Sequence, residues 1–308
     1  MFYDLNVPAT NTVTPELTRT IHFLVELGYT TICLSHTLSG KLPTPLTNPL
    51  PTASAFSLPS TVNILRRATI LISDPSTNLR LPQLSQHYDI LALRPTTEKL
   101  LLQACQSLDA DLISLDFSQR LPFHLKHKVV GLALSKGLCF EVCYSAGIAD
   151  ATARRNLIQN VQGLIRATRN GRGIVISSEA KKAVGLRAPH DVVNLACLWG
   201  LSPDKARDAV CGLAGKVVAQ ARMRRKSFKG VVEVISDGGI EKIQNEKKRK
   251  AKEAERDGKR AKSAEQQAQG GQAREGQQKS EKLTKVQRKA KAKAVSDVKG
   301  AASESAKT

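Results

Sequence analysis

Polar side chains recur at the carboxyl ends of short apolar runs, where a parallel barrel would gather them on one face. Asp4 and Asn6 lie two residues apart, so both would point to the same side of a strand. Such a ring could bind a metal ion or supply a general acid and base. Its other candidate members are His36, Arg94, Asp116, Glu141, Tyr144, Ser177, Ser178 and Glu179.

The spacing argues against a metal-dependent hydrolase. Barrel phosphoesterases and amidohydrolases typically carry a His-x-His pair on the first strand, because two imidazoles two residues apart can bind one metal ion. Here Asp4 and Asn6 stand at that spacing. We therefore expect no catalytic residue and no metal ligand in this chain. Internal hydrogen bonds that close the barrel mouth are the alternative role for the ring.

Positive charge is concentrated in the second half of the chain. Residues 1–150 carry 11 Lys and Arg against 11 Asp and Glu. Residues 151–235 carry 16 against 5, and residues 236–308 carry 20 against 11, so the three differences 0, +11 and +9 give the net charge of +20. A folded region with so many cations repels itself unless a polyanion binds to it. This pattern favours a nucleic-acid partner.

The cations of the second half include a helical stripe and a turn. In a helix over 150–169, Arg155, Arg166 and Arg169 share one face. The glycine-rich segment 169–173 would let the backbone approach a phosphate closely, and the planar guanidinium group suits phosphate oxygens. For any single arginine, a solvated helix face is the simpler interpretation. The candidate RNA-binding residues are Arg155, Arg166, Arg169, Arg172, Lys181, Lys182, Arg187, Arg222, Arg224 and Arg225.

Aromatic residues are too scarce in this region to stack on many bases. Trp199 and Phe228 are the only Phe, Trp or Tyr residues in 151–235. Base stacking of the kind seen on RRM and OB surfaces is therefore disfavoured, and recognition of the backbone and shape of structured RNA is favoured. Helix-turn-helix, zinc-finger and basic-zipper patterns are absent, although charge alone does not exclude DNA.

The elements that must position these residues alternate between strand and helix. This alternation predicts an α/β fold, a TIM-like (β/α) barrel of about eight units, with an open doubly wound sheet as the alternative. The expected strands are Phe2–Val7, Thr31–Ser35, part of Val62–Ile72, Ile90–Leu93, Leu112–Leu115, Cys139–Cys143, Ile174–Ser177 and, more weakly, Val231–Ile235. The expected helices are Thr14–Leu27, Thr96–Leu108, Pro122–Lys136, Asp150–Arg169 and Pro203–Lys226.

Composition divides the chain into a barrel domain over 1–235 and a disordered tail over 236–308. The tail is rich in Lys, Glu, Gln and Ala and has no aromatic residue with which to build a core. Within it, Lys247–Lys250 and Lys259–Arg260 have the spacing of a nuclear import signal, with a solvated charge run as the alternative. Residues 37–60 hold five of the 13 prolines, which predicts a flexible Pro/Ser/Thr-rich loop.

The sequence shows no membrane-spanning run, no secretory signal and no redox-active cysteine pair. No apolar run is long enough to cross a membrane, and the first residues do not fit a secretory signal. The six cysteines include no C-x-x-C pair, so buried free thiols in a reducing compartment are expected. No nucleotide-binding glycine motif follows any expected strand.

The chain resembles the thirty-kilodalton protein subunit of ribonuclease P, which is shared with ribonuclease MRP, in its filamentous-fungal form. The resemblance covers most of residues 1–235. It rests on Tyr3–Pro8 (YDLNVP), Tyr88–Leu102 (YDILALRPTTEKLLL), Leu112–Phe123 (LISLDFSQRLPF), Phe140–Ser145 (FEVCYS), Arg154–Ile158 (RRNLI), Ile176–Ala180 (ISSEA) and Leu186–Leu195 (LRAPHDVVNL). Ser177, Ser178 and segment 186–191 are motif positions with no assigned atomic role.

The resemblance implies a barrel related to the polymerase-and-histidinol-phosphatase (PHP) type, without its metal histidines. It implies a non-catalytic, RNA-binding subunit of a nuclear and nucleolar ribonucleoprotein. The RNA would bind magnesium and cut precursor tRNA at its 5′ end, while the MRP particle would process precursor rRNA. The chain itself would bind no cofactor. Its partners would be these RNAs, a small RRM-like subunit and other ribonuclease P/MRP proteins, with two copies per particle as one option. The alternatives are a stand-alone metal-dependent phosphoesterase or a nuclear protein scaffold.

Overall fold

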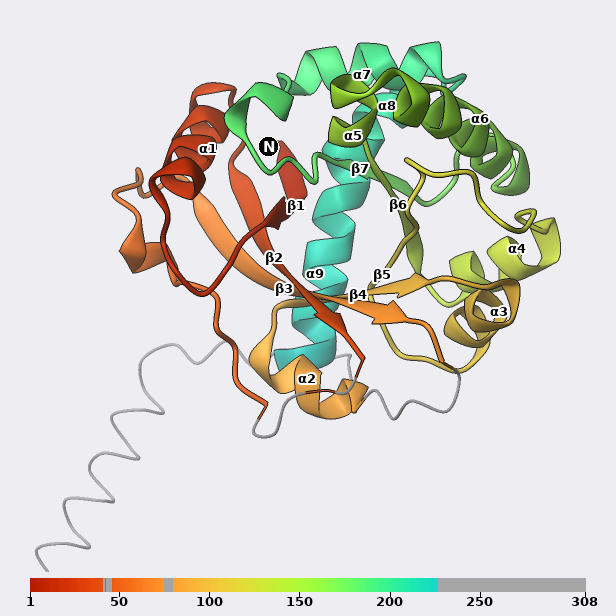
Figure 1. The fold of residues 1–308 in the computed structure, drawn as a ribbon, viewed down its shortest axis with the longest axis horizontal. Coiled ribbons are helices and arrows are strands. Elements are labelled where there is room, and N and C mark those ends of the chain that lie inside the picture. Colours follow the sequence, from red (N-terminus) through yellow and green to blue (C-terminus); the bar gives the residue numbers. More distant parts are fainter. Residues whose placement is uncertain (41, 43–45, 75–79, 227–308) are drawn as a thin grey trace, which may run out of the picture. The chain divides into compact units, whose positions relative to one another are not determined.

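A parallel sheet forms the wall of the barrel, and its strands pair in chain order (Figure 1). The computed structural model describes residues 1–40, 42, 46–74 and 80–226. Within these ranges the sheet has seven strands and all six ladders are parallel, so helices return the chain between most strands. The strands are β1 (Tyr3–Pro8), β2 (Thr31–Ser39), β3 (Asn63–Ile72), β4 (Ile90–Pro95), β5 (Leu112–Ser114), β6 (Cys139–Cys143) and β7 (Ile174–Ser177).

The predicted α/β barrel is confirmed, with seven strands in the described part of the chain rather than about eight. Strands β6 and β7 have the predicted bounds. The further strand expected at Val231–Ile235 lies outside the described residues, as does the tail over 236–308. No helix in the described ranges is long and apolar enough to cross a bilayer.

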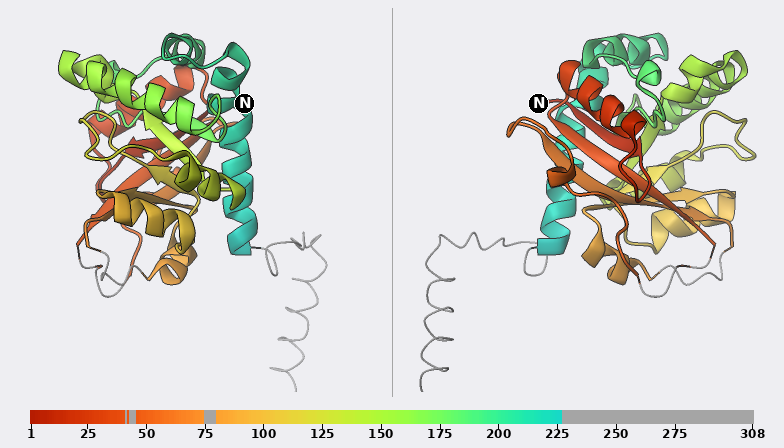
Figure 2. Two further views of the ribbon diagram at one scale, coloured as in Figure 1. Left: turned by 90° about the vertical axis from the view of Figure 1, so that its right-hand side faces the viewer. Right: turned by 60° about the vertical axis from the view of Figure 1, so that its left-hand side comes forward.

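Helices cover the outside of the wall, except the last one, which lies across one end of the barrel (Figures 1 and 2). They are α1 (Pro15–Glu26), α2 (Leu81–His87), α3 (Glu98–Gln106), α4 (His127–Ser135), α5 (Ser145–Ala149), α6 (Ala151–Ala167), α7 (Pro189–Leu198), α8 (Pro203–Val210) and α9 (Gly212–Lys226), with short 3-10 turns η1 (Ala53–Ala55) and η2 (Ala183–Gly185). Capping residues start several of them. Thr14 accepts a hydrogen bond from the Leu17 amide, and Asp150 accepts one from Ala153 at 2.7 Å.

Two helix predictions were wrong in detail. The single helix expected over Pro203–Lys226 is broken at Cys211, where φ is −128° and ψ is −86°, so α8 and α9 are separate. The helix expected over Pro122–Lys136 begins only at His127, and residues 122–126 precede it without helical structure.

Helix α9 lies across the end of the barrel at which the strands begin (Figures 1 and 2). Its small and branched side chains Ala214, Val217 and Ala221 follow one helical stripe and are buried. They pack in one cluster with inward residues of the wall, namely Leu5, Cys33, Ile90, Ala92, Leu112, Cys139 and Val175. Helix α9 therefore completes the core at this end.

Asp111 anchors the last turn of α9. Its carboxylate accepts hydrogen bonds from Arg225 at 2.7 Å, from Arg224 at 3.4 Å and from the Leu91 amide at 2.9 Å. Because Asp111 is buried and precedes β5, the contact ties the helix to the wall.

The segment 37–60 includes the end of strand β2 and residues of the core. Residues 37–39 continue β2, and within the described part of the segment Leu50 and Phe56 are buried in the core. The Asn48 side chain donates to the His87 carbonyl at 2.8 Å. These apolar side chains give the segment a surface to bury against the barrel, which the count of prolines did not reveal.

Candidate functional site

A buried ion pair occupies the barrel interior. Arg67 on β3 and Glu141 on β6 are fully buried, and two guanidinium nitrogens meet two carboxylate oxygens at 2.5 and 2.6 Å. Arg67 also donates to the Leu5 carbonyl at 2.8 Å and to the Thr69 hydroxyl at 3.0 Å. Ser177 donates to Glu141 at 2.8 Å. The pair is thus bidentate and surrounded by further hydrogen bonds, the geometry in which a buried pair is best compensated.

The pair stays charged although both groups are buried. Burial by itself raises the pKa of Glu141, but the Arg67 charge and hydrogen bonds from Arg67, Ser114 and Ser177 outweigh it and hold the pKa below its usual value. Burial by itself lowers the pKa of Arg67, and the Glu141 charge outweighs that effect. At neutral pH the carboxylate is therefore already neutralised by a cation of the chain itself.

Sequence reasoning missed Arg67. The signal was a charged residue inside the apolar run 64–72 of an expected strand, at the same alternation as Leu65 and Thr69. A charge in such a place needs a partner of opposite sign on a facing strand. Glu141, a charged residue within the apolar strand Cys139–Cys143, was the corresponding signal for the partner of Arg67.

Asp4 and Asn6 help to close the barrel between its first and last strands. Strands β1 and β7 lie side by side, with no ladder between them in the described sheet. The Ser178 amide donates to Asp4 at 3.1 Å and the Glu179 amide to the Asn6 carbonyl at 2.8 Å. The Asn6 side chain donates to Glu141 at 3.4 Å. The two residues at the His-x-His spacing thus make structural hydrogen bonds, as the alternative role of the ring predicted.

Asp4 is expected to make folding less favourable as the pH rises from about 4 to about 6. Its Oδ2 is buried without a hydrogen-bond partner among the described residues. Burial raises the pKa of Asp4 from 3.8 to about 6, against hydrogen bonds from Ser178 and Asn6 that lower it. The folded state keeps a proton that the unfolded state releases, so the free energy of unfolding falls through this window and stays lower above it.

Asp4→Asn should remove this dependence, which amounts to about 1–3 kcal/mol. Urea denaturation of both proteins at pH values of about 4 and about 7 measures it. The pH dependence that comes from other carboxyl groups is present in both proteins and cancels in the difference. If the free energy of unfolding depended on pH identically in the two proteins, the raised pKa of Asp4 would be contradicted.

A second ion pair lies nearer the carboxyl ends of the strands. Arg94 on β4 donates to Glu179 at 2.8 Å and to the Ser114 carbonyl at 3.1 Å. The side chains of Arg94 and Glu179 are 16% and 30% exposed, so this ion pair lies at the rim of the barrel rather than in its centre. Burial lowers the pKa of Arg94, and the Glu179 charge raises it above its usual value.

Three predicted ring members do not join these pairs. His36 is half-buried and shares a hydrogen bond of 3.1 Å with the Tyr88 hydroxyl. Asp116 accepts from the amide and hydroxyl of Ser118, and Tyr144 accepts from the Arg187 amide. The convergence of strand ends in a parallel barrel predicted the end of the barrel at which these residues lie. It does not predict the direction in which each side chain points.

In the described part of the chain, the His, Cys, Asp and Glu side chains do not gather into a metal-binding cluster. Within the described ranges, no group of three such side chains could hold a metal ion. Cys33, Cys105, Cys139 and Cys143 are buried free thiols, and burial raises the pKa of each.

Six of the predicted cationic residues are well exposed. Arg155 and Arg166 project from α6, and Arg169 and Arg172 lie on the turn that follows it. Lys181 and Lys182 precede η2. All six lie along α6 and the loops on either side of β7, so they are free to meet a large anionic partner.

The other four predicted cations lie on α9 and in the segment before α7. Arg224 and Arg225 hold α9 through Asp111, and Arg225 also donates to the Tyr88 carbonyl at 2.8 Å. Arg187 is half-buried and donates to the carbonyls of Val184 and Leu186. Arg222 is exposed on α9. The RNA-binding role of all ten residues stays a prediction.

The fold and the site define a barrel whose interior holds its own ion pair and which exposes further cations along α6 and around β7. Residues 1–226 match the family described as RNase P subunit p30. The chain belongs to this family, which confirms the resemblance seen in its sequence and makes it a protein subunit of ribonuclease P.

Relatives in three organisms agree with this membership. The chain is 40% identical to the probable ribonuclease P protein subunit 3 of Schizosaccharomyces pombe, over 75% of this chain and 98% of the relative. It is 34% identical to the ribonuclease P/MRP protein subunit RPP1 of Saccharomyces cerevisiae, over 78% and 86%. It is 32% identical to the mouse ribonuclease P protein subunit p30, over 76% and 90%.

A solved structure shares the fold. One chain of an archaeal ribonuclease P with mature tRNA superimposes with a TM-score of 0.58, covering 77% of this chain and 99% of that chain. The sequence identity is 16%, so this likeness concerns the fold alone.

Proposed function

We propose that the chain is a non-catalytic, RNA-binding protein subunit of ribonuclease P and ribonuclease MRP particles. It supports 5′ maturation of precursor tRNA and the processing of precursor rRNA, while the partner RNA carries the magnesium ions and the catalysis. The observation that carries the proposal is the division of charge in the barrel. The Arg67–Glu141 pair neutralises the interior, and the exposed cations of α6 and its following turn are left to meet phosphates.

The mechanism is electrostatic. Folding a large RNA brings phosphates close together, and a cationic protein surface lowers their mutual repulsion. Such a surface reduces the magnesium concentration that the active RNA fold needs. Arginine suits this task because its planar guanidinium group stays charged and matches phosphate oxygens.

The partner RNA is identified by what co-purifies with the tagged full-length chain. Sequencing of that RNA should return the ribonuclease P and MRP RNAs. If the purified chain alone cuts phosphoesters when metal is added, the phosphoesterase alternative holds instead. A complex that survives nuclease treatment of the extract intact supports the scaffold alternative.

Changing Arg155, Arg166 and Arg169 together to Gln should flatten the salt dependence of RNA binding. Each phosphate contact contributes about 0.7–0.9 to the slope of log affinity against log salt, so losing three should reduce the slope by about 2–3. Filter binding at several salt concentrations, with a transcript of the co-purified RNA, measures it.

The matched control removes three exposed cations from the electrically neutral half, namely Arg19, Lys99 and Arg120. This control should leave the slope nearly unchanged. Equal slopes for the wild type and the α6 variant would show that these arginines of α6 and its following turn do not contact the RNA.

The protein partners of the chain and its location in the cell are part of the same proposal. We expect a small RRM-like subunit and other ribonuclease P/MRP proteins as neighbours, with two copies of this chain per particle as one option. We also expect residence in the nucleus and nucleolus. The import-like cluster Lys247–Lys250 lies outside the described residues, and fluorescence imaging of a chain with these four residues changed to Ala tests it.

A further inference from the structure

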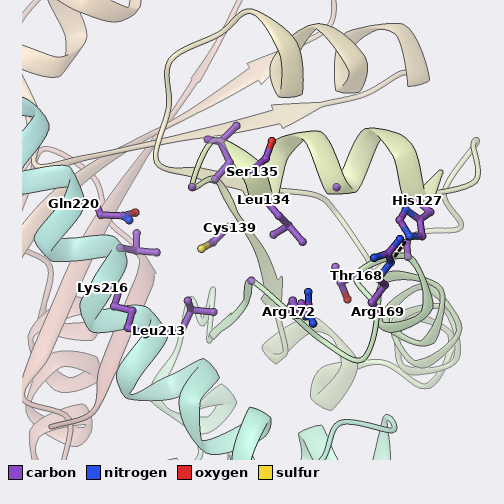
Figure 3. Close-up of a pocket in the computed structure, with 16 residues that line it drawn as sticks. His127, Leu134, Ser135, Cys139, Thr168, Arg169, Arg172, Leu213, Lys216 and Gln220 are labelled. Atoms are coloured by element: carbon purple, nitrogen blue, oxygen red, sulfur yellow. Dashed lines mark hydrogen bonds between the residues drawn. The ribbon is translucent and has the colours of Figure 1, made fainter. Parts of the chain in front are cut away.

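A groove opens at the end of the barrel where β6 and β7 begin (Figure 3). Helix α4 forms one wall with His127, Leu134 and Ser135, and α9 forms the other with Leu213, Lys216 and Gln220. The turn after α6 closes one side. The groove has a volume of about 640 Å³, within the range of sites that bind small molecules or parts of larger ones.

The lining of the groove is cationic at its rim and apolar at its floor. Arg169, Arg172 and Lys216 line it, and none of its sixteen lining residues is Asp or Glu. Leu138 and Val217 contribute apolar surface between the cations. A concave surface with cations and no acid focuses a positive potential, so it favours an anionic occupant.

The turn that carries two of these arginines is held rigidly. Gly171 and Gly173 have φ of +78° and +67°, a region that favours glycine. A Cβ on Gly173 would lie 2.2 Å from Leu134 Cδ2, so the backbone packs directly on α4. Thr168 accepts a hydrogen bond from the Gly171 amide at 3.1 Å. The arginines are therefore presented by a backbone that is set before any ligand arrives.

Arg169 is oriented within the groove by His127. Its Nε donates to His127 Nε2 at 2.6 Å, while its terminal amino groups have no such partner in the described residues (Figure 3). Lys216 lies on the opposite wall (Figure 3). Cations thus face the groove from two walls, an arrangement that suits successive phosphates of one strand more than a single point charge.

We propose that this groove binds a sugar–phosphate strand of the partner RNA, a site that deepens the proposed function and rests on it. The phosphates lie on Arg169, Arg172 and Lys216, and the less polar ribose faces pack on the leucine and valine floor. Among the described residues that line the groove, His127 alone is aromatic, so stacking on bases contributes little. Binding here is independent of base sequence.

A groove-filling substitution tests the site without changing charge. Gly131 lines the groove on α4, and a Cβ there meets only His127 Nδ1, at 4.0 Å. Gly131→Leu should therefore fold and obstruct the strand, lowering affinity for a transcript of the co-purified RNA by about tenfold. Gln86→Leu on α2 is the control, since Gln86 is exposed and lies outside both the groove and α6. It should bind as the wild type does.

A charge substitution tests the phosphate contacts. Arg172→Gln with Lys216→Gln should weaken binding and reduce the salt slope by about 1.4–1.8, as expected for two lost phosphate contacts. Thermal melting checks that every variant folds. If the wild type binds the RNA while the filled and the uncharged variants bind equally well, the groove proposal fails and the proposed function stands. If the wild type itself does not bind, the proposed function fails.

Crosslinking decides which class of molecule occupies the groove. Gln220 is exposed on the α9 wall, and a photoreactive benzoylphenylalanine at that position in the full chain reports on its neighbour in the purified particle. An adduct that ribonuclease digests is expected. An adduct with another protein would overturn the proposal and assign the groove to a protein partner.

Discussion

Arg67→Met is expected to destabilise the barrel by about 3–5 kcal/mol, because it leaves Glu141 charged and buried without its partner. The loss is a large part of the 5–15 kcal/mol that typically holds a domain together. Urea denaturation of the wild type and the variant, followed by circular dichroism, measures it. The variant should unfold at a clearly lower urea concentration.

The double variant Arg67→Met with Glu141→Gln supplies the control. Removing both charges relieves the uncompensated carboxylate, so the double variant should recover part of the stability that the single variant loses. The single variants Arg67→Met and Glu141→Gln give the two separate losses of stability. A double variant that loses the full sum of these two losses would show that Arg67 and Glu141 are not energetically coupled.

A chain that ends at Cys211 is expected to lose cooperative folding, whereas a chain that ends at Ile235 should keep it. Removing α9 exposes the cluster that Ala214, Val217 and Ala221 cover. Each large side chain returned to water costs about 1.5–3 kcal/mol, and several such losses exceed the whole stability of a typical domain.

Thermal melting followed by circular dichroism compares the two chains. A sharp transition for the chain that ends at Cys211 would contradict the role given to α9. Loss of cooperative melting in the chain that ends at Ile235 would instead show that residues after 235 contribute to the fold.

The strand pattern was predictable because buried parallel strands are short β-branched runs between helices. Cys139–Cys143 and Ile174–Ser177 were found with their true bounds for this reason. The break at Cys211 was missed although Gly212 directly follows it and glycine can mark the end of a helix. Only the need to lie across the barrel end gives α9 a direction different from that of α8.

The site was half predictable. Asp4, Asn6 and Glu141 were found among the polar residues of the expected strands, although Glu141 lies in the middle of β6. Arg67 in β3 was missed although it carries the same signal, a charge within an apolar run. The groove could not be seen in the sequence at all. Its walls come from helices about 90 residues apart in the chain, and only the closed barrel brings them together.

The place of α9 bears on how the protein folds while it is being made. The first strand, Tyr3–Pro8, emerges from the ribosome early, yet it packs against a helix that is translated after every described strand. Until that helix emerges, the nascent chain carries an apolar opening of the kind that chaperones shield. Completion of this barrel is therefore a late event in synthesis.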